Sequence, residues 1–444
     1  MFSLIVALAL MVCFAGACAK KTPSPSPSPT VPAPTTPAPS PSPSPTVPAP
    51  TTTPGPPIKI AISGPMKFFH GQHQWLGAKL AADEINAAGG ILVGGVKRPV
   101  ELVKVNNNEL TSITDASLAT EKAITANKVD FFISGIKSDS ALAIMDVACS
   151  YKKVILSAGS SIMQLSQRVV DDYEKYKYWF RPHSTIDYDN RVMTAFDCHI
   201  IPRKLREAGI QPKAALFGEK SRIADAAFAA AREEYAKEGV EIVGEWRPSI
   251  TATDVRAELQ AIKAAGATII NRQMGGPNGT AAARQWGELQ IPAVMTGSSN
   301  VAGMQEHWEA TKGYCNFEIT YGAIGYGELT PKTKPFWERF EKATGEWPNL
   351  FSLWAYEDMY VLKEAIEAAG STNPDKVVEA LENLDYQGVQ GRIRFAPNHD
   401  VLDDFPEFVG WVALQWQNGK LVPVYPEVVP LQLPPWMIAY WKKS

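Results

Sequence analysis

Short apolar runs of strand length alternate with amphipathic stretches of helix length from Ile58 onward. The first series contains strands expected over 58–63, 100–105, 130–134 and 154–157, with helices over 76–88 and 114–127. A second series contains strands expected over 214–217, 240–246, 268–271 and 293–296, with helices over 224–238, 254–265 and 280–289. Such alternation is typical of βαβ units with parallel strands. The sequence therefore predicts an α/β fold in two similar lobes, each a parallel sheet flanked by helices.

The part of the chain after the second series is expected to supply further helices and then strands. The helices are predicted over 336–344, 353–369 and 375–384, and the chain is expected to finish on strands that include 409–416. Single hydrophobic cores rarely grow beyond about 250–300 residues. The length of the body from Ile58 to Ser444 thus also favours two lobes.

The first residues are typical of a secretion signal. An apolar run from Phe2 to Phe14 is too short to span a bilayer, and small residues precede Cys18. We predict a signal peptide over residues 1–17. The small residues before Cys18 resemble the lipobox of bacterial lipoproteins, which implies a lipidated Cys18; an ordinary cleaved signal with an incidental cysteine is the alternative.

Residues 18–57 are predicted to be a tether. From Thr22 to Pro57 nearly every residue is Pro, Ser, Thr or Ala, and the block SPSPSPTVPAPTT occurs twice. Such a segment buries no apolar surface, and its prolines favour an extended polyproline II chain. A lipid followed by a spacer fits a protein that works at a membrane surface, outside the cytoplasm.

Charge and cysteine content set further bounds. The net charge of −3 gives no reason to expect nucleic acid as a partner. Outside the signal and the anchor, three cysteines remain, Cys149, Cys198 and Cys315, without metal-ligand spacing. One disulfide with one free thiol and three free thiols are both compatible with the sequence.

The catalytic motifs that can be recognised by pattern are absent from the sequence. It has no G-x-S-x-G elbow, no phosphate-binding G-x-x-x-x-G-K-[ST] loop, no H-E-x-x-H and no Gly-rich dinucleotide fingerprint after the first strand. An extracellular hydrolase would need a nucleophile with its base, and no such set is visible. We therefore expect a protein that is not an enzyme and needs no cofactor or metal.

Four stretches resemble the branched-chain amino acid type of solute-binding protein of ABC importers. They are GAKLAADEINAAGGI at 77–91, FISGIKS at 132–138, WAYEDMY at 354–360 with AAGS at 368–371, and YQGVQGRIRF at 386–395. The resemblance implies the type I periplasmic-binding fold, with three segments crossing between lobes. It places lobe one at 58–182 and 323–395, and lobe two at 183–322 and 396–444.

The resemblance also implies a mechanism and partners. Two lobes close on a small-molecule ligand, and the closed form engages a permease whose transport is driven by ATPase subunits; ligand binding supplies the free energy that favours closure. Such a protein is expected to be a monomer. A ligand-sensing module of the same fold that reports to a receptor is the alternative function.

Ligands of open α/β sheets bind in loops at the carboxyl ends of the strands. In lobe one the positions that match the family's site are His70, Ser138, Gly159, Ser160 and Ser161. Hydroxyl and amide donors there suit a carboxylate, although helix N-capping would equally explain Ser138 and Ser160. We predict that the ligand contacts residues of both lobes: Phe69, His70, Ile136, Lys137, Ser138, Gly159, Ser160, Ser161, Arg222, Gln273, Met274, Ser298 and Ser299.

Lobe two departs from the amino-acid-binding pattern. The resemblance implies a Tyr and then an acid for the ligand's ammonium group, but the matching stretches, QMGGP at 273–277 and GSSN at 297–300, hold neither. A buried ammonium without a carboxylate is costly. The loops instead offer aromatics and cations, namely Phe68, Phe69, His70, Lys137, Arg222 and Arg272. We therefore prefer an organic carboxylate, which an aromatic body would suit, as the ligand; core packing of the two phenylalanines and a solvated rim for the cations are the alternatives.

Overall fold

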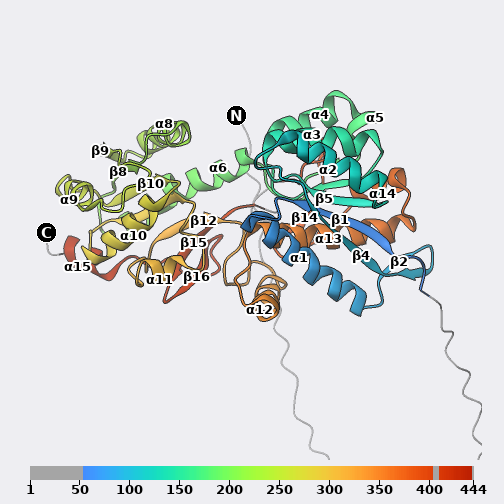
Figure 1. Cartoon of the computed structure of the whole chain (residues 1–444). Coiled ribbons are helices and arrows are strands. Elements are labelled where there is room, and N and C mark those ends of the chain that lie inside the picture. The colour runs from blue at the N-terminus through green and yellow to red at the C-terminus, as the bar shows by residue number, and fades with distance from the viewer. Residues whose placement is uncertain (1–53, 404–409, 443–444) are drawn as a thin grey trace, which may run out of the picture. The chain divides into compact units, whose positions relative to one another are not determined.

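The computed structural model describes residues 54–403 and 410–442 (Figure 1). The predicted signal peptide, Cys18 and the tether up to residue 53 lie outside the described residues. Within those residues no helix combines the length and the apolar character that crossing a bilayer requires.

The first sheet has five parallel strands. Their order across the sheet is β4 (Val100–Asn106), β1 (Ile58–Gly64), β5 (Phe131–Ser134), β6 (Ile155–Ser157) and β7 (Trp179–Phe180). The helices that follow these strands are α1 (Phe69–Ala87), α2 (Ile113–Thr125), α3 (Ser138–Ser150) and α4 (Met163–Asp171). Because all five strands are parallel, their carboxyl ends lie at one edge of the sheet, as the sequence predicted.

The second sheet repeats this plan with four parallel strands. Their order is β11 (Val294–Ser299), β10 (Ile269–Met274), β8 (Lys213–Gly218) and β9 (Glu241–Trp246), with helices α8 (Arg222–Lys237), α9 (Arg256–Ala264) and α10 (Pro277–Glu288) between them (Figure 1). Most strands of both sheets are almost continuously buried, which is characteristic of parallel strands covered on both faces, whereas the outer strands β4 and β9 are mostly partly exposed.

A third, antiparallel sheet joins β12 (Ile319–Gly322) to β15 (Val412–Gln417) and β16 (Lys420–Tyr425). The prediction that the chain finishes on strands was wrong, because α15 (Pro435–Trp441) follows them. Met437 of this helix is fully buried, and the indole of Trp436 donates to the carbonyl of Ile291 at 3.0 Å. An aromatic-rich stretch thus packs on the second sheet as a helix rather than as another strand.

Several boundaries differ from the predictions. Helix α1 begins at Phe69, seven residues before its predicted start at Leu76, and strands β10 and β11 continue three residues beyond their predicted ends. The remaining elements are β2 (Ile91–Val93), β3 (Val96–Arg98), α5 (Tyr173–Tyr176), α6 (Ile186–Ala195), α7 (Ile201–Glu207), α11 (His307–Ala310), α12 (Thr333–Thr344), α13 (Leu350–Ala369), α14 (Pro374–Glu382), β13 (Tyr386–Gln387) and β14 (Arg392–Ile393). As predicted, Asn373 caps α14, and Pro374 occupies its first position.

A π-helical segment, Phe196–Ile200, links α6 to α7 and was not foreseen. Pro202 follows it and removes one backbone donor. The segment turns Asp197 inward, where its carboxylate accepts hydrogen bonds from Tyr321 and, at 2.5 Å, from Thr296. The irregular turn therefore ties this helix to strands β11 and β12.

The buried apolar residues form separate cores. One cluster draws on 58–180 and 323–401, and two further clusters draw on 196–321 and 412–437. The chain thus passes three times between the first cluster and the other two, as the resemblance implies. The residue boundaries of the lobes stay a prediction. Cys149, Cys198 and Cys315 are buried free thiols in three different parts of these cores.

Candidate ligand-binding site

Three serines lie side by side at the carboxyl ends of neighbouring strands in the first sheet. Ser63 of β1 is in register with Ser134 of β5, which is in register with Ser157 of β6. Asn107 donates to the Ser63 hydroxyl at 3.2 Å, whereas the buried hydroxyls of Ser134 and Ser157 have no partner among the described residues. Buried polar groups normally find a partner, so this edge of the sheet holds spare hydrogen-bonding capacity.

The loop after β6 brings four predicted contact residues together. A Cβ atom on Gly159 would lie 3.5 Å from the Cα of Ile136, and the Ser160 amide donates to the carbonyl of Gly135 at 2.9 Å. The Ser160 hydroxyl lies 3.5 Å from the Ser138 hydroxyl. Ser138 is the first residue of α3, after the cap residue, and the Ser160 hydroxyl caps no helix, so capping explains neither residue.

Ser161 lies in the same loop and is partly exposed. Its carbonyl accepts from the amide of Ile186 at 3.3 Å, at the start of α6. The loop after β6 is thus attached to the segment by which the chain leaves the first core.

An aromatic cluster borders this loop. It consists of Phe69 and His70, at the start of α1, and Phe351, at the start of α13. The ring centroids of His70 lie 3.9 Å from Phe69 and 4.9 Å from Phe351, and Phe351 Cε1 would lie 3.3 Å from a Cβ on Gly159. Because α1 starts earlier than predicted, these residues stand on a helix and not in a loop. Phe351 was missed because only residues after strands were considered.

His70 is the polar member of the aromatic cluster. Burial lowers the pKa of its imidazole, so the ring is neutral at pH 7. Its Nδ1 atom is buried and has no partner among the described residues. A neutral imidazole can donate from one nitrogen and accept at the other, which suits a polar group of a ligand.

The amides of Ile136 and Lys137 are already engaged by Glu109, which the sequence analysis did not single out. The Glu109 Oε2 atom accepts from the Ile136 amide at 2.8 Å and from the Lys137 amide at 3.0 Å. The Lys137 ammonium donates to the carbonyl of Leu110 at 3.2 Å. Lys137 is therefore directed toward the loop after β4.

In the second sheet, the predicted residues end two neighbouring strands. Gln273 is in register with Ser298, and Met274 with Ser299. Met274 and Ser299 are buried, and the Ser299 hydroxyl has no partner among the described residues. These four residues form the strand ends of lobe two in the candidate site.

An acid does reach these loops, although it comes from another strand. Glu219, directly after β8, accepts from the Gly275 amide at 2.9 Å and from the Asn278 side chain at 3.1 Å. It is only 8% exposed. The glycine–glutamate pair after an apolar run was its only sequence signal. Both carboxylate oxygens serve the protein's own loop.

The two cationic candidates of lobe two lie in different environments, and only Arg272 is withdrawn from a ligand. Arg272 is fully buried within β10 and forms an ion pair with Glu318, so the prediction that it lies in a loop was wrong: the strand continues through it. Arg222 is the first residue of α8 and is exposed, after the cap residue Ser221.

One group of side chains has the composition of a metal site. His307, Cys315 and Glu318 place ligand atoms within 4.8 Å of one another in the second core. Burial raises the pKa of the Glu318 carboxyl, but the charges of Arg272 and His307 outweigh this effect and lower it overall, while burial raises the pKa of the Cys315 thiol. Because a guanidinium already balances the carboxylate, a further cation would be repelled, and the group is better explained as a buried ion-pair network.

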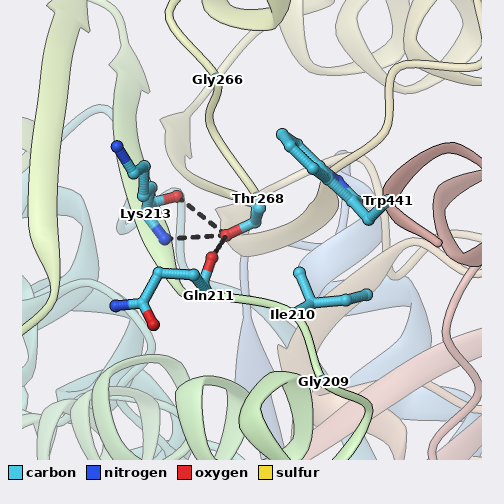
Figure 2. Close-up of a pocket in the computed structure, with 7 residues that line it drawn as sticks. All are labelled: Gly209, Ile210, Gln211, Lys213, Gly266, Thr268 and Trp441. Atoms are coloured by element: carbon cyan, nitrogen blue, oxygen red, sulfur yellow. Dashed lines mark hydrogen bonds between the residues drawn. The ribbon is translucent and has the colours of Figure 1, made fainter. Parts of the chain in front are cut away.

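A shallow pocket of about 200 Å³ lies away from these loops (Figure 2). Thr268 is central to it: its hydroxyl donates to the carbonyl of Gln211 at 3.1 Å and accepts from the Lys213 amide at 2.8 Å. Lys213 begins β8, and Thr268 precedes β10. The pocket thus lies at the amino ends of the strands, opposite to the candidate site.

The model of the family described as periplasmic binding protein matches residues 58–406. The chain belongs to this family. It is therefore a binding protein that acts outside the cytoplasm, and not an enzyme. An "Amino acid binding protein" from Pseudomonas aeruginosa is 24% identical over 82% of this chain and 91% of its own length.

Two solved structures support the fold. The branched-chain amino acid transporter substrate-binding protein LivJ from Streptococcus pneumoniae, in complex with isoleucine, has a TM-score of 0.63 at 21% identity and covers 84% of this chain and 99% of its own. A solute-binding protein of an ABC transporter from R. palustris, in complex with benzoate, has a TM-score of 0.59 at 15% identity and covers 83% and 95%. The family match and these likenesses together make the chain a solute-binding protein with the type I periplasmic-binding fold, similar to the branched-chain amino acid type.

Proposed function

We propose that this chain is the lipid-anchored solute-binding protein of an ABC importer, and that it captures a small organic carboxylate, preferably an aromatic one, for delivery to a permease. One observation carries the choice of ligand: the aromatic cluster Phe69–His70–Phe351 stands directly beside the hydroxyl-bearing loop at Gly159. The rings can cover an apolar body, while the Ser138 and Ser160 hydroxyls and a neutral His70 offer donors to an acid group.

The hydrogen bonds that Glu219 already accepts in lobe two also favour a ligand without an ammonium group. Isoleucine and benzoate, the ligands of the two structural neighbours, both carry a carboxylate, and only isoleucine carries an ammonium group. Glu219 already accepts from Gly275 and Asn278. A ligand without an ammonium group makes no demand on this carboxylate.

Titration calorimetry on the body from Ile58 tests the ligand. The panel consists of benzoate, 4-hydroxybenzoate, isoleucine and leucine, each added to protein freed of co-purified ligand by partial unfolding and refolding. We expect binding of the aromatic acids to exceed that of the amino acids. Tight binding of leucine with no binding of either aromatic acid would contradict the proposal.

Delivery and anchoring need separate experiments. We expect small-angle scattering to show a smaller radius of gyration when the binding acid is added, because the lobes close on it. Mass spectrometry of the mature protein should find a diacylglyceryl group on Cys18, and a C18S variant should leave the membrane fraction. Unmodified Cys18 in a membrane-free protein would refute the anchor while leaving ligand capture intact.

A further inference from the structure

We propose that Glu109 is a positioning residue of the binding site: its carboxylate serves as a built-in anion that binds the amides of Ile136 and Lys137, immediately before α3, and so fixes Ser138 beside Ser160. The effect of this positioning on ligand affinity rests on the proposed function. Its structural part can be tested without any ligand.

The carboxylate of Glu109 is placed as a bound anion would be. Oε2 accepts from the amides of Ile136 and Lys137 at 2.8 and 3.0 Å, and Oε1 accepts from the Asn107 side chain at 3.1 Å. These amides belong to the cap residue of α3 and to the residue before it, so the carboxylate lies near the positive end of the helix dipole. Here the chain supplies that anion itself, from the loop after β4, two strands away from β5.

The contact is reinforced from both sides. The Ser140 hydroxyl of α3 donates to the Glu109 carbonyl at 2.7 Å, and the Lys137 ammonium donates to the Leu110 carbonyl at 3.2 Å. Asn107 in turn donates to the hydroxyl of Ser63 at 3.2 Å. The start of α3 and the loop after β4 therefore form one rigid unit that ends at the row of serines.

Burial makes this carboxylate depend on its hydrogen bonds. Glu109 is 0% exposed, and no lysine or arginine of the described residues forms a close ion pair with its carboxylate. Desolvation raises its pKa, whereas hydrogen bonds from Asn107, Lys137 and Ile136 act in the opposite direction. Because amide donors provide most of the compensation, a small free carboxylate could replace the side chain if it were removed.

The arrangement decides which groups can hold the ligand. The amides of Ile136 and Lys137, both predicted as ligand contacts, are occupied. We therefore expect a ligand carboxylate to bind the hydroxyls of Ser138 and Ser160, which lie 3.5 Å apart, and the imidazole of His70 rather than these two amides. Glu219 holds the loop after β10 in lobe two in a similar way, through the amide of Gly275.

Hydrogen exchange on the ligand-free wild-type protein is the first test. We expect the amides of Ile136 and Lys137 to exchange about a hundredfold or more slowly than in an unfolded chain, because Glu109 holds them closed. Exchange at the unfolded rate would overturn the proposal. This measurement needs no variant, so it decides even if a substitution prevents folding.

Chemical rescue is the second test. We expect Glu109→Ala to lower the melting temperature, and sodium formate to restore it by filling the vacated space, with little effect of sodium chloride at equal ionic strength. Glu109→Gln, which keeps an acceptor, should lie between wild type and Glu109→Ala and respond less to formate. Glu341→Gln, an exposed site on α12, is the matched control. A Glu109→Ala protein that ignores formate would refute the built-in anion.

Affinity is the third measurement. With benzoate as the probe, we expect Glu109→Ala to bind at least about tenfold more weakly, which corresponds to about 1.4 kcal/mol, and formate to recover part of the loss. If wild type binds benzoate and Glu109→Ala binds it equally well, the positioning role fails and the proposed function stands. If wild type binds no acid of the panel, the proposed function fails while exchange and rescue still decide the role of Glu109.

Discussion

The guanidinium of Arg181 donates to the carboxylate of Asp400 through Nε at 2.8 Å, and its Nη2 lies 2.6 Å from the same oxygen. Its Nη1 donates to the carbonyls of Ser160 at 3.2 Å and Ile162 at 2.8 Å. The backbones of Arg181 and Asp400 also form a parallel bridge. One buried ion pair therefore connects the candidate ligand loop after β6 with two of the segments that pass between the cores.

Removing one partner of this pair should be costly. Arg181→Met leaves the Asp400 carboxylate buried without its cation and frees two carbonyls, so we expect a loss of about 3–5 kcal/mol in the free energy of unfolding. Urea unfolding measures it. Lys79→Ala, which breaks the exposed pair with Asp83 on α1, should cost less than about 1 kcal/mol. Equal losses in the two variants would contradict the structural role of the buried pair.

Close packing of α1 against α13 gives a second prediction. A Cβ atom on Gly77 would lie 2.0 Å from the carbonyl oxygen of Ser352, a backbone atom that can move only with its helix. Gly77→Ala should therefore destabilise the protein by about 1–3 kcal/mol, despite the better helix propensity of alanine. Thermal unfolding of both variants measures this effect. Gly303→Ala, where no atom lies within 4 Å of the new Cβ, should leave the free energy of unfolding nearly unchanged. A stabilised Gly77→Ala protein would show that the helices can separate freely.

A third prediction concerns pH. Burial raises the pKa of Asp189 on α6 to about 7, although the Ser184 hydroxyl donates to it at 2.6 Å. Its folded pKa exceeds the unfolded value near 3.8, so the folded protein binds more protons between these values and loses stability as pH rises through this range. The contribution of this group is therefore fully present below about pH 4 and is lost as pH passes 7.

The comparison of Asp189→Asn with wild type isolates this contribution. Because asparagine does not titrate, we expect the variant's unfolding free energy, measured by urea at several pH values from 4.5 to 8, to fall less steeply with pH than that of wild type. Asp187 is an exposed neighbour on the same helix. For Asp187→Asn we expect a curve of unfolding free energy against pH that is parallel to that of wild type. Parallel curves for Asp189→Asn would exclude a raised pKa in the folded state.

The sequence predicted the βαβ order well because burial on both faces makes parallel strands continuous apolar runs. Gly77 opens the first stretch of the family resemblance, and its close approach to Ser352 gives that residue a physical reason. The residues that shape the site were harder to predict from the sequence, because hydrogen bonds between distant loops leave little local pattern. Glu109 reaches across a strand to Ile136, and Glu219 reaches Gly275. The identity of Arg272 as a buried ion-pair partner was likewise hidden, since a strand that continues through an arginine has no apolar signature.

The aromatic cluster gives the last prediction. Phe351 lies 6.0 Å from Phe69 and 4.9 Å from His70, between centroids, and faces the loop at Gly159. If the cluster covers the ring of an aromatic acid, Phe351→Ala should weaken benzoate binding by about tenfold to a hundredfold, since a buried phenyl contact contributes about 1.5–3 kcal/mol.

The choice of comparison ligand makes this test specific for an aromatic contact. Calorimetry should show a larger loss for benzoate than for acetate, because both carry the carboxylate and only benzoate has a ring for Phe351 to contact. Tyr151→Ala, an exposed aromatic residue just after α3, should leave benzoate affinity unchanged. Unchanged benzoate affinity in Phe351→Ala would mean that the rings pack only against each other, and the ligand would then have to be sought among aliphatic acids held by the serine hydroxyls alone.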